Sequence, residues 1–302
     1  MSYSTRIDYT LHLADNALIL GHRNSEWTGH GPILEQDIAL SNIALDLIGQ
    51  ARNCYQYAAR LINESQPARA GQKAGAPLAP LPHAAMEVTE DSLAYLRDGW
   101  DFRNCLLVEQ ANGDWAKTIL RQFFFSAYQF YLYEELQDSR DTQLAAIAVK
   151  SYKEVSYHLR WSSEWVIRLG DGTAESHSRM ERALGDLWKF TGELFLPAAY
   201  ERQLAAEGIA VDLPSIQPKW EEKVRQILEE AQFPVLVAAP GSGPARDSGS
   251  ATTKDRGTGK DQGASGGPWM QTGGKEGRHT EHLGYVLAEM QFLQRAYPGC
   301  EW

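Results

Sequence analysis

The residues best suited to chemistry are carboxylates and a histidine on two long predicted helices. A four-helix bundle can hold two metal ions with a glutamate from each of two helices and a Glu-x-x-His motif from each of the other two. That spacing places carboxylate and imidazole on one helix face, and oxygen with imidazole ligands suits iron or manganese. Here Asp46 is followed three residues later by Gly49, and Glu154 by Tyr157, while His158 comes one residue too late. Both positions that would supply imidazole lack it.

The other two long helices add few ligands. One carries Asp15 beside Asn16, and the middle of the other has no acid. At most Asp15, Asp46, Glu154 and His158 could bind metal, against about four carboxylates and two imidazoles in a dinuclear site. The alternative, a degenerate metal site at Asp46, Glu154 and His158, would make the chain an enzyme. We instead predict a metal-free network of buried polar groups that hydrogen-bond one another. Its expected members are Asp46, Gln50, Glu154, His158, Asn16 and Gln129.

Two motifs near the C-terminal end are weaker candidates. The stretch 272–275, Thr-Gly-Gly-Lys, lacks the first glycine and the hydroxyl residue of a phosphate-binding loop, so we expect a turn. His279 and His282 share a helix face, but the HExxH pattern is absent, and a helix start near His279 or Thr280 is the favoured interpretation. No GxSxG motif is present, which gives a serine hydrolase of that type no support.

The elements that would position these residues are helices, because helical periodicity dominates and strand alternation is almost absent. Asp114 is a suitable N-cap, the run 170–172 is a stop signal, and Pro197 should bend a helix. The pattern predicts an all-α, ferritin-like four-helix bundle with additional packed helices. The predicted helices cover about 4–21, 33–64, 90–97, 114–137, 142–169, 174–207, 218–231 and 280–297.

Two segments do not suit the core of this single predicted domain, 1–302. Residues 66–85 contain four prolines and seven alanines, and residues 238–268 contain eight glycines, four serines and three prolines. Such compositions bury too little apolar surface to offset the entropy of ordering them, so we expect disordered or loop insertions.

Aromatic residues cover more than one face of the helix predicted at 114–137. One face belongs to the core, and the other is covered either by an extra helix or by a partner chain, of which we favour the partner. The residues are Phe123, Phe124, Phe125, Tyr128, Phe130, Tyr131 and Tyr133.

Composition and charge exclude several classes. Lys and Arg number 29 against 39 Asp and Glu, a net charge of −10, which argues against nucleic acid and against an anionic membrane surface. No apolar run is long enough to span a bilayer, and the first residues do not resemble a signal peptide. Three widely spaced cysteines suggest no disulfide framework, so we expect a cytoplasmic protein.

The chain resembles the C subunits of the bacterial 1,2-phenylacetyl-CoA epoxidases, a ferritin-like family. The resemblance covers nearly the whole chain outside 66–85 and 238–268, and its motifs are specific as a set. They lie at 29–32, 43–53, 106–110, 121–122, 153–154, 157–160, 272–275, 279–284 and 287–291.

The resemblance implies a non-catalytic, structural subunit of a hetero-oligomeric monooxygenase in phenylacetate catabolism. A separate catalytic subunit would hold the di-iron centre, and a reductase subunit would supply electrons from NADPH, so that O₂ forms the ring 1,2-epoxide of phenylacetyl-CoA. No cofactor and no catalytic residue is expected in this chain. The alternatives are an independent metal-dependent oxygenase or an acyl-CoA-binding module.

The resemblance also implies contact with the acyl-CoA substrate at two segments. In the first, Phe102 and Asn104 match the family pattern, whereas Asp101 and Arg103 depart from it. Trp100 and Phe102 could face an adenine, and Arg97 or Arg103 a phosphate; the alternative is an ordinary surface turn. The second segment is Arg202, Gln203 and Leu204, of which only Leu204 matches.

Overall fold

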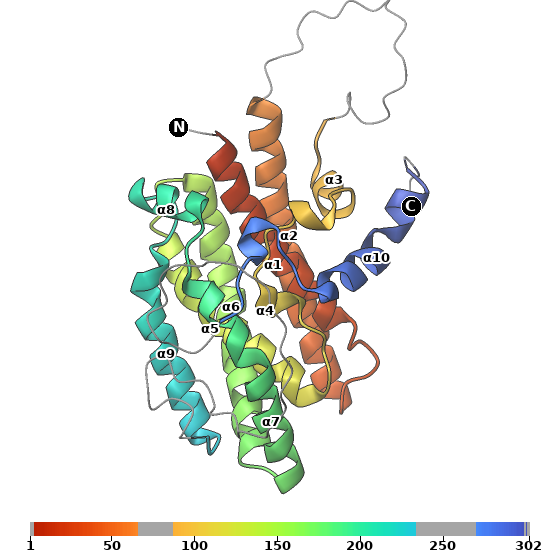
Figure 1. The fold of residues 1–302 in the computed structure, drawn as a ribbon, viewed down its shortest axis with the longest axis vertical. Coiled ribbons are helices and arrows are strands. Elements are labelled where there is room, and N and C mark those ends of the chain that lie inside the picture. The colour runs from red at the N-terminus through yellow and green to blue at the C-terminus, as the bar shows by residue number, and fades with distance from the viewer. Residues whose placement is uncertain (1–2, 66–86, 234–269, 299, 301–302) are drawn as a thin grey trace, which may run out of the picture.

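Four long helices run alongside one another at the centre of the molecule (Figure 1). They are α1 (Tyr3–Ser25), α2 (Leu34–Ser65), α5 (Trp115–Leu136) and α6 (Thr142–Gly170). α1 packs along α2, α5 packs along α6, and α2 also contacts α6. A long connection between the two pairs is typical of ferritin-like bundles, and the predicted all-α, ferritin-like fold is confirmed. The computed structural model describes residues 3–65, 87–233, 270–298 and 300.

Local signals in the sequence set where the long helices begin and end. The Asp114 carboxylate caps α5 by accepting the Lys117 N–H at 3.0 Å. The Asp141 carboxylate caps α6 through the N–H groups of Gln143 and Leu144. α6 ends at Gly170, where a stop was predicted. These bonds satisfy amides that have no partner inside a helix.

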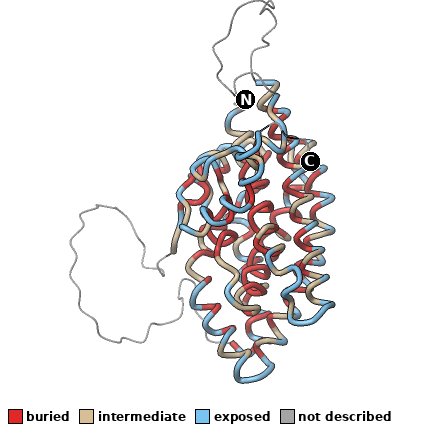
Figure 2. The backbone as a smooth tube through the Cα atoms, turned by 90° about the vertical axis from the view of Figure 1, so that its right-hand side faces the viewer, coloured by how far each residue is buried: buried red, intermediate tan, exposed pale blue. Residues whose placement is uncertain are grey.

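Shorter helices pack around this bundle. α7 and α9 lie on α5 and α6, α8 lies on α1, and α10 contacts α3, η1, α4 and α1. Buried residues follow the inner sides of the long helices (Figure 2). The elements are α3 (Glu90–Tyr95), η1 (Gly99–Asp101), α4 (Leu106–Glu109), α7 (Ala174–Leu187), η2 (Trp188–Phe190), η3 (Gly192–Phe195), α8 (Ala199–Ala206), α9 (Leu213–Glu230), η5 (Gly274–Glu276) and α10 (Glu281–Ala296).

The aromatic residues of α5 are covered by this chain itself. Phe124 packs against Trp188 and Trp220, with ring centroids 5.9 and 5.8 Å apart. Tyr128 packs edge-on against Phe195. The extra-helix alternative is therefore confirmed for Phe124 and Tyr128, and the favoured partner interface is wrong for these two rings, because α7, η3 and α9 occupy that side of α5. Phe130 and Tyr131 are half-buried, and the partner interface stays a prediction for them.

The continuous helix predicted over 174–207 is wrong. The chain is α-helical to Leu187, forms η2 and η3, and becomes helical again only at Ala199. Proline disfavours the helical conformation at the residue before it, and Leu196 is indeed extended, at φ −86° and ψ 105°. The break therefore lies before Pro197 and replaces the predicted bend. Its tight turns place Glu193 and Leu194 in the interior.

Other differences are smaller. α9 begins at Leu213 and not at Pro218, because burial of Leu213 and Ile216 stabilises the first turns despite the proline inside the helix. The short helix α4 was not predicted. The predicted insertions 66–85 and 238–268 lie outside the described residues. No helix within the described ranges is long and apolar enough to cross a membrane.

Candidate functional site

The polar residues predicted inside the bundle form two bonded pairs between α2 and α6. His158 Nε2 lies 3.0 Å from Asp46 Oδ2, and Gln50 Nε2 donates to Glu154 Oε2 at 3.0 Å. Gln129, on α5, donates to Gln50 Oε1 at 3.4 Å. The predicted hydrogen bonds are present among these five residues, but they form two separate groups, and the predicted burial is wrong for Asp46 and Glu154, which are half-buried. Each carboxylate already accepts a hydrogen bond from a neighbouring helix.

The two positions that lack imidazole lie toward the outside of the bundle. Tyr157 is 37% exposed, and a Cβ added to Gly49 would meet no atom within 4 Å. His158 is fully buried, but it binds Asp46 on the neighbouring helix. Among the residues that the structure describes, no group of three or more His, Cys, Asp or Glu side chains is placed to hold a metal ion. The donors present here do not fit a di-iron centre.

Two further candidates belong to a different part of the molecule. The Asn16 Oδ1 accepts the Cys105 N–H at 2.8 Å, and its Nδ2 lies 3.2 Å from His12 Nε2. Asp15 binds Arg97 and accepts the Tyr55 hydroxyl at 2.5 Å. The prediction that Asn16 joins the network of Asp46 and Glu154 is wrong, because this turn of α1 faces the segment after α3.

The segment 101–104 is tied to the interior through its main chain. Arg103 N–H donates to Asp15 Oδ2 at 2.8 Å, and Arg103 O lies 2.7 Å from His12 Nδ1. Phe102 has no exposed surface and lies beneath the Arg97 guanidinium, 4.3 Å from the ring centroid. Phe102 therefore leaves no face for a base to stack on, and Arg97 is paired with Asp15.

The rest of this segment divides into inner and outer side chains. Asn104 is fully buried and donates to Glu109 Oε2 at 2.8 Å, which is a structural role. Trp100 is 78% exposed, Asp101 is exposed and Arg103 is half-buried. Only these outer side chains can meet a ligand.

The second candidate segment lies on α8, also against α1. Leu204 is buried, whereas Arg202 and Gln203 are exposed. Gln203 accepts the Thr5 hydroxyl at 3.3 Å. His12 lies between the two segments, since Nδ1 contacts Arg103 O and Nε2 lies 3.6 Å from Glu201 Oε1. The fold thus brings both predicted segments to one side of α1, although they are about a hundred residues apart in the chain.

Sequence reasoning missed a group of buried charges that binds the 272–280 segment to the bundle. Glu193, placed by η3, accepts the N–H groups of Leu106, Gly273 and Gly274, each at 2.7 Å. Burial raises the pKa of Glu193, while these amides and the Lys275 charge oppose that rise. The run Thr-Gly-Gly-Lys therefore forms a turn, as predicted, and binds a protein carboxylate where a phosphate loop would bind its ligand.

Lys275 and Glu109 complete this group. Lys275 Nζ lies 3.0 Å from Glu201 Oε2 and donates to the carbonyl of Leu196 at 3.1 Å. Glu109 Oε1 accepts the N–H of Thr280 at 2.6 Å, and its Oε2 lies 2.8 Å from His279 Nδ1. Thr280 is the N-cap residue of α10, which confirms the predicted helix start. Lys275 and His279 belong to motifs visible in the sequence, but their spacing did not indicate that they contact Glu201 and Glu109.

Comparison with known proteins agrees with this architecture. The model of the family described as phenylacetic acid catabolic protein matches residues 2–236 and 265–302. The C subunit of the 1,2-phenylacetyl-CoA epoxidase of Escherichia coli (strain K12) is 43% identical over 294 residues, which cover 97% of this chain and 98% of that protein. This chain therefore belongs to the phenylacetic acid catabolic protein family.

Proposed function

We propose that this chain is the non-catalytic structural subunit of a phenylacetyl-CoA 1,2-epoxidase complex. It would pair with the di-iron catalytic subunit and support it during aerobic phenylacetate catabolism, while a reductase subunit delivers electrons from NADPH to the complex. The near full-length similarity to the C subunit of such an epoxidase supports membership in the complex. Among the described residues Cys54, Cys105 and Cys300 are free thiols, and this favours the cytoplasm.

One observation carries the non-catalytic part of the proposal. Asp46 and Glu154, the carboxylates that remain between α2 and α6, are bonded to His158 and Gln50. A dinuclear centre needs about four carboxylates and two imidazoles facing one another. The carboxylates that remain between α2 and α6 are thus engaged in hydrogen bonds within the chain, which supports a role in stabilising the bundle.

A second role is contact with the acyl-CoA substrate. Both predicted segments meet His12 of α1, through the Arg103 carbonyl and through Glu201. Trp100 and Arg202 are exposed and Arg103 is half-buried in or beside these segments. A guanidinium is suited to phosphate and an indole to a base. We infer that these outer side chains, and not Phe102, would contact the substrate at the edge of a site held by the catalytic subunit.

The decisive experiment is co-expression with the di-iron subunit, followed by metal analysis of each separated chain. The proposal expects iron in the partner and none above background in this chain. A pair of irons in this chain, with absorption from a bridged centre, would overturn it in favour of an independent oxygenase. Tight phenylacetyl-CoA binding by the isolated chain, with no complex formed, would favour an acyl-CoA-binding module.

A further inference from the structure

α2 and α6 present one continuous outer surface. The two helices are antiparallel, since Asp46 meets His158 and Gln50 meets Glu154 while Gln36 meets Trp165. We call the outward side of residues 38–60 and 146–160 the α2–α6 face. Among the described helices, α3 contacts α2 within this range, where Glu90 meets Arg52 and Gln56, whereas α7 to α10 make no extensive contact with α2.

The centre of the α2–α6 face exposes two apolar side chains, Leu45 at 66% and Tyr157 at 37%, and Ile38, 51% exposed, extends this apolar surface to the end of the face. Leu45 and Ile38 are seven residues apart, which places them on the same side of α2. Exposed apolar residues grouped in this way mark interaction sites more often than scattered ones do.

Gly49 lies one turn after Leu45, on the same side of α2. Glycine destabilises a helix interior relative to alanine, and no described residue requires it, because an added Cβ would meet none of their atoms within 4 Å. A glycine allows another backbone or a bulky side chain to approach a helix closely. Its position on the α2–α6 face is the one at which an incoming element would approach.

Unpaired cations surround the centre. Arg60, Lys150, Lys153 and Arg160 form no ion pair with the described residues, and Arg52 has only a 3.6 Å contact with Glu90. The chain as a whole carries a net charge of −10. Even with the carboxylates of Asp46 and Glu154 included, cations outnumber carboxylates over residues 38–60 and 146–160, so this face is basic although the chain as a whole is acidic.

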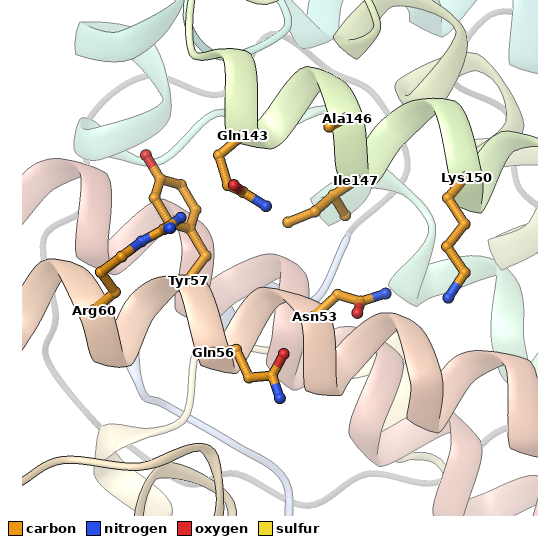
Figure 3. A pocket seen from close by; sticks show the side chains of 8 residues that line it. All are labelled: Asn53, Gln56, Tyr57, Arg60, Gln143, Ala146, Ile147 and Lys150. Atoms are coloured by element: carbon orange, nitrogen blue, oxygen red, sulfur yellow. The ribbon is translucent and has the colours of Figure 1, made fainter.

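A groove at one end of the face presents hydrogen-bond donors. It has a volume of about 320 Å³, and Figure 3 shows Arg60 and Lys150 on its opposite helices. Asn53, Gln56 and Gln143 add amides to its walls. A carboxylate side chain of a partner would find both charge and N–H donors there.

We propose that the α2–α6 face docks the catalytic subunit through a pair of helices whose apolar centre is bordered by acidic side chains. This rests on the proposed function for the identity of the partner. Charge complementarity favours a different chain over a second copy, because a two-fold pairing would bring this basic surface against the same basic surface of the copy. The acidic side chains of the partner would neutralise the cations of the α2–α6 face, and one of them would enter the groove.

The test is the affinity of full-length variants for the di-iron subunit, measured by biolayer interferometry. Gly49→Gln fills the point of closest approach and should weaken binding at least about tenfold, or about 1.4 kcal/mol. Its matched control is Gly185→Gln in α7, another helical glycine with open space around its Cβ, which should bind as the wild type does. Melting curves verify that both variants fold.

Charge reversal gives an independent measurement. The double variant Lys150→Glu, Lys153→Glu should lose at least about tenfold in affinity and much of the salt dependence of binding. Arg182→Glu, on the exposed side of α7, should change neither. If the wild type binds strongly, and the Gly49→Gln and double-lysine variants bind with the same affinity, the proposed docking face is overturned. The proposed function would still stand.

Two other outcomes also separate the proposals. A wild-type chain that forms no complex with the di-iron subunit overturns the proposed function. A wild-type chain that dimerises by itself, and becomes monomeric with Gly49→Gln, identifies a second copy as the occupant and overturns the acidic partner.

Discussion

His279 Nδ1 lies 2.8 Å from the carboxylate of Glu109, and the other ring nitrogen of His279 lies 3.0 Å from the carbonyl oxygen of Phe102. Both ring nitrogens thus face acceptors, and only the protonated imidazole can donate from both. Glu109 also holds Thr280 and Asn104. This ion pair joins α4, the 101–104 segment and the start of α10, which are separated widely in the chain.

Replacement of Glu109 by alanine should strongly destabilise the fold. The side chain is fully buried, and its loss leaves His279 and the N–H of Thr280 without their acceptor. Breaking a buried ion pair costs about 3–5 kcal/mol. Urea unfolding measures this loss, and Glu289→Ala on the exposed side of α10 should leave the midpoint unchanged. Equal midpoints for Glu109→Ala and the wild type would contradict the structural role of this carboxylate.

The same pair predicts a dependence of stability on pH. Burial alone would lower the pKa of His279, but the hydrogen bond and charge of Glu109 oppose it, and the net pKa is raised. A raised pKa in the folded state stabilises the fold fully below the unfolded value of about 6.5, and this contribution is lost as pH rises through the folded pKa.

The destabilisation by His279→Gln should therefore be larger at about pH 5.5 than at about pH 9. Denaturant titrations of the variant and the wild type at both pH values measure the difference. Protonation of His12 affects stability in the opposite direction. Burial lowers the pKa of His12, so its protonation in acid opposes folding. A His279→Gln effect that grows with pH would contradict a protonated ring.

Lys275 and Glu201 should behave as a coupled pair. Both side chains are almost fully buried, and Lys275 Nζ lies 3.0 Å from Glu201 Oε2. Lys275→Met leaves the carboxylate unpaired in the interior and should cost about 3–5 kcal/mol. Lys275→Met combined with Glu201→Leu should cost less than the sum of the two single changes, because neither charge remains.

The control for this cycle is an exposed ion pair. Arg225 Nη1 lies 2.7 Å from Glu229 Oε1 on the surface of α9, where solvent weakens the interaction. Its double-mutant cycle should give no measurable coupling. Additive effects of Lys275→Met and Glu201→Leu would show that the buried pair is not coupled.

Much of the fold follows from local sequence patterns. The four long helices were predictable because their apolar residues recur with helical periodicity and their ends carry caps or stops such as Asp114 and Gly170. The absence of a Glu-x-x-His pattern from the helices of Asp46 and Glu154 was visible from spacing alone. These features depend only on residues within a few turns of one another.

The buried charges were not predictable in this way. Glu109 and His279 are 170 residues apart, and no periodicity relates a short helix to a distant turn. The partner of Asn16 was also not predictable from local sequence. Its helix was predicted correctly, but its contact with Cys105 depends on the packing of the distant 101–105 segment. The proline indicated a disturbance near Pro197, but the turns η2 and η3, which place Glu193 against the distant Gly273, were not predictable from local sequence.

Gly274 provides the sharpest steric test of the buried turn. A Cβ at this position would lie 2.2 Å from the carbonyl oxygen of Asn104 and 3.1 Å from the N–H of Leu106, so the backbone itself must move. Such movement would also disturb the bonds from Gly273 and Gly274 to Glu193. Gly274→Ala should therefore lower the melting temperature markedly, whereas Gly185→Ala, with open space at its Cβ and better helix propensity, should stabilise by about 0.5–1 kcal/mol. Calorimetry of both variants measures the contrast, and a Gly274→Ala chain as stable as the wild type would show that the turn does not pack against Asn104 as described.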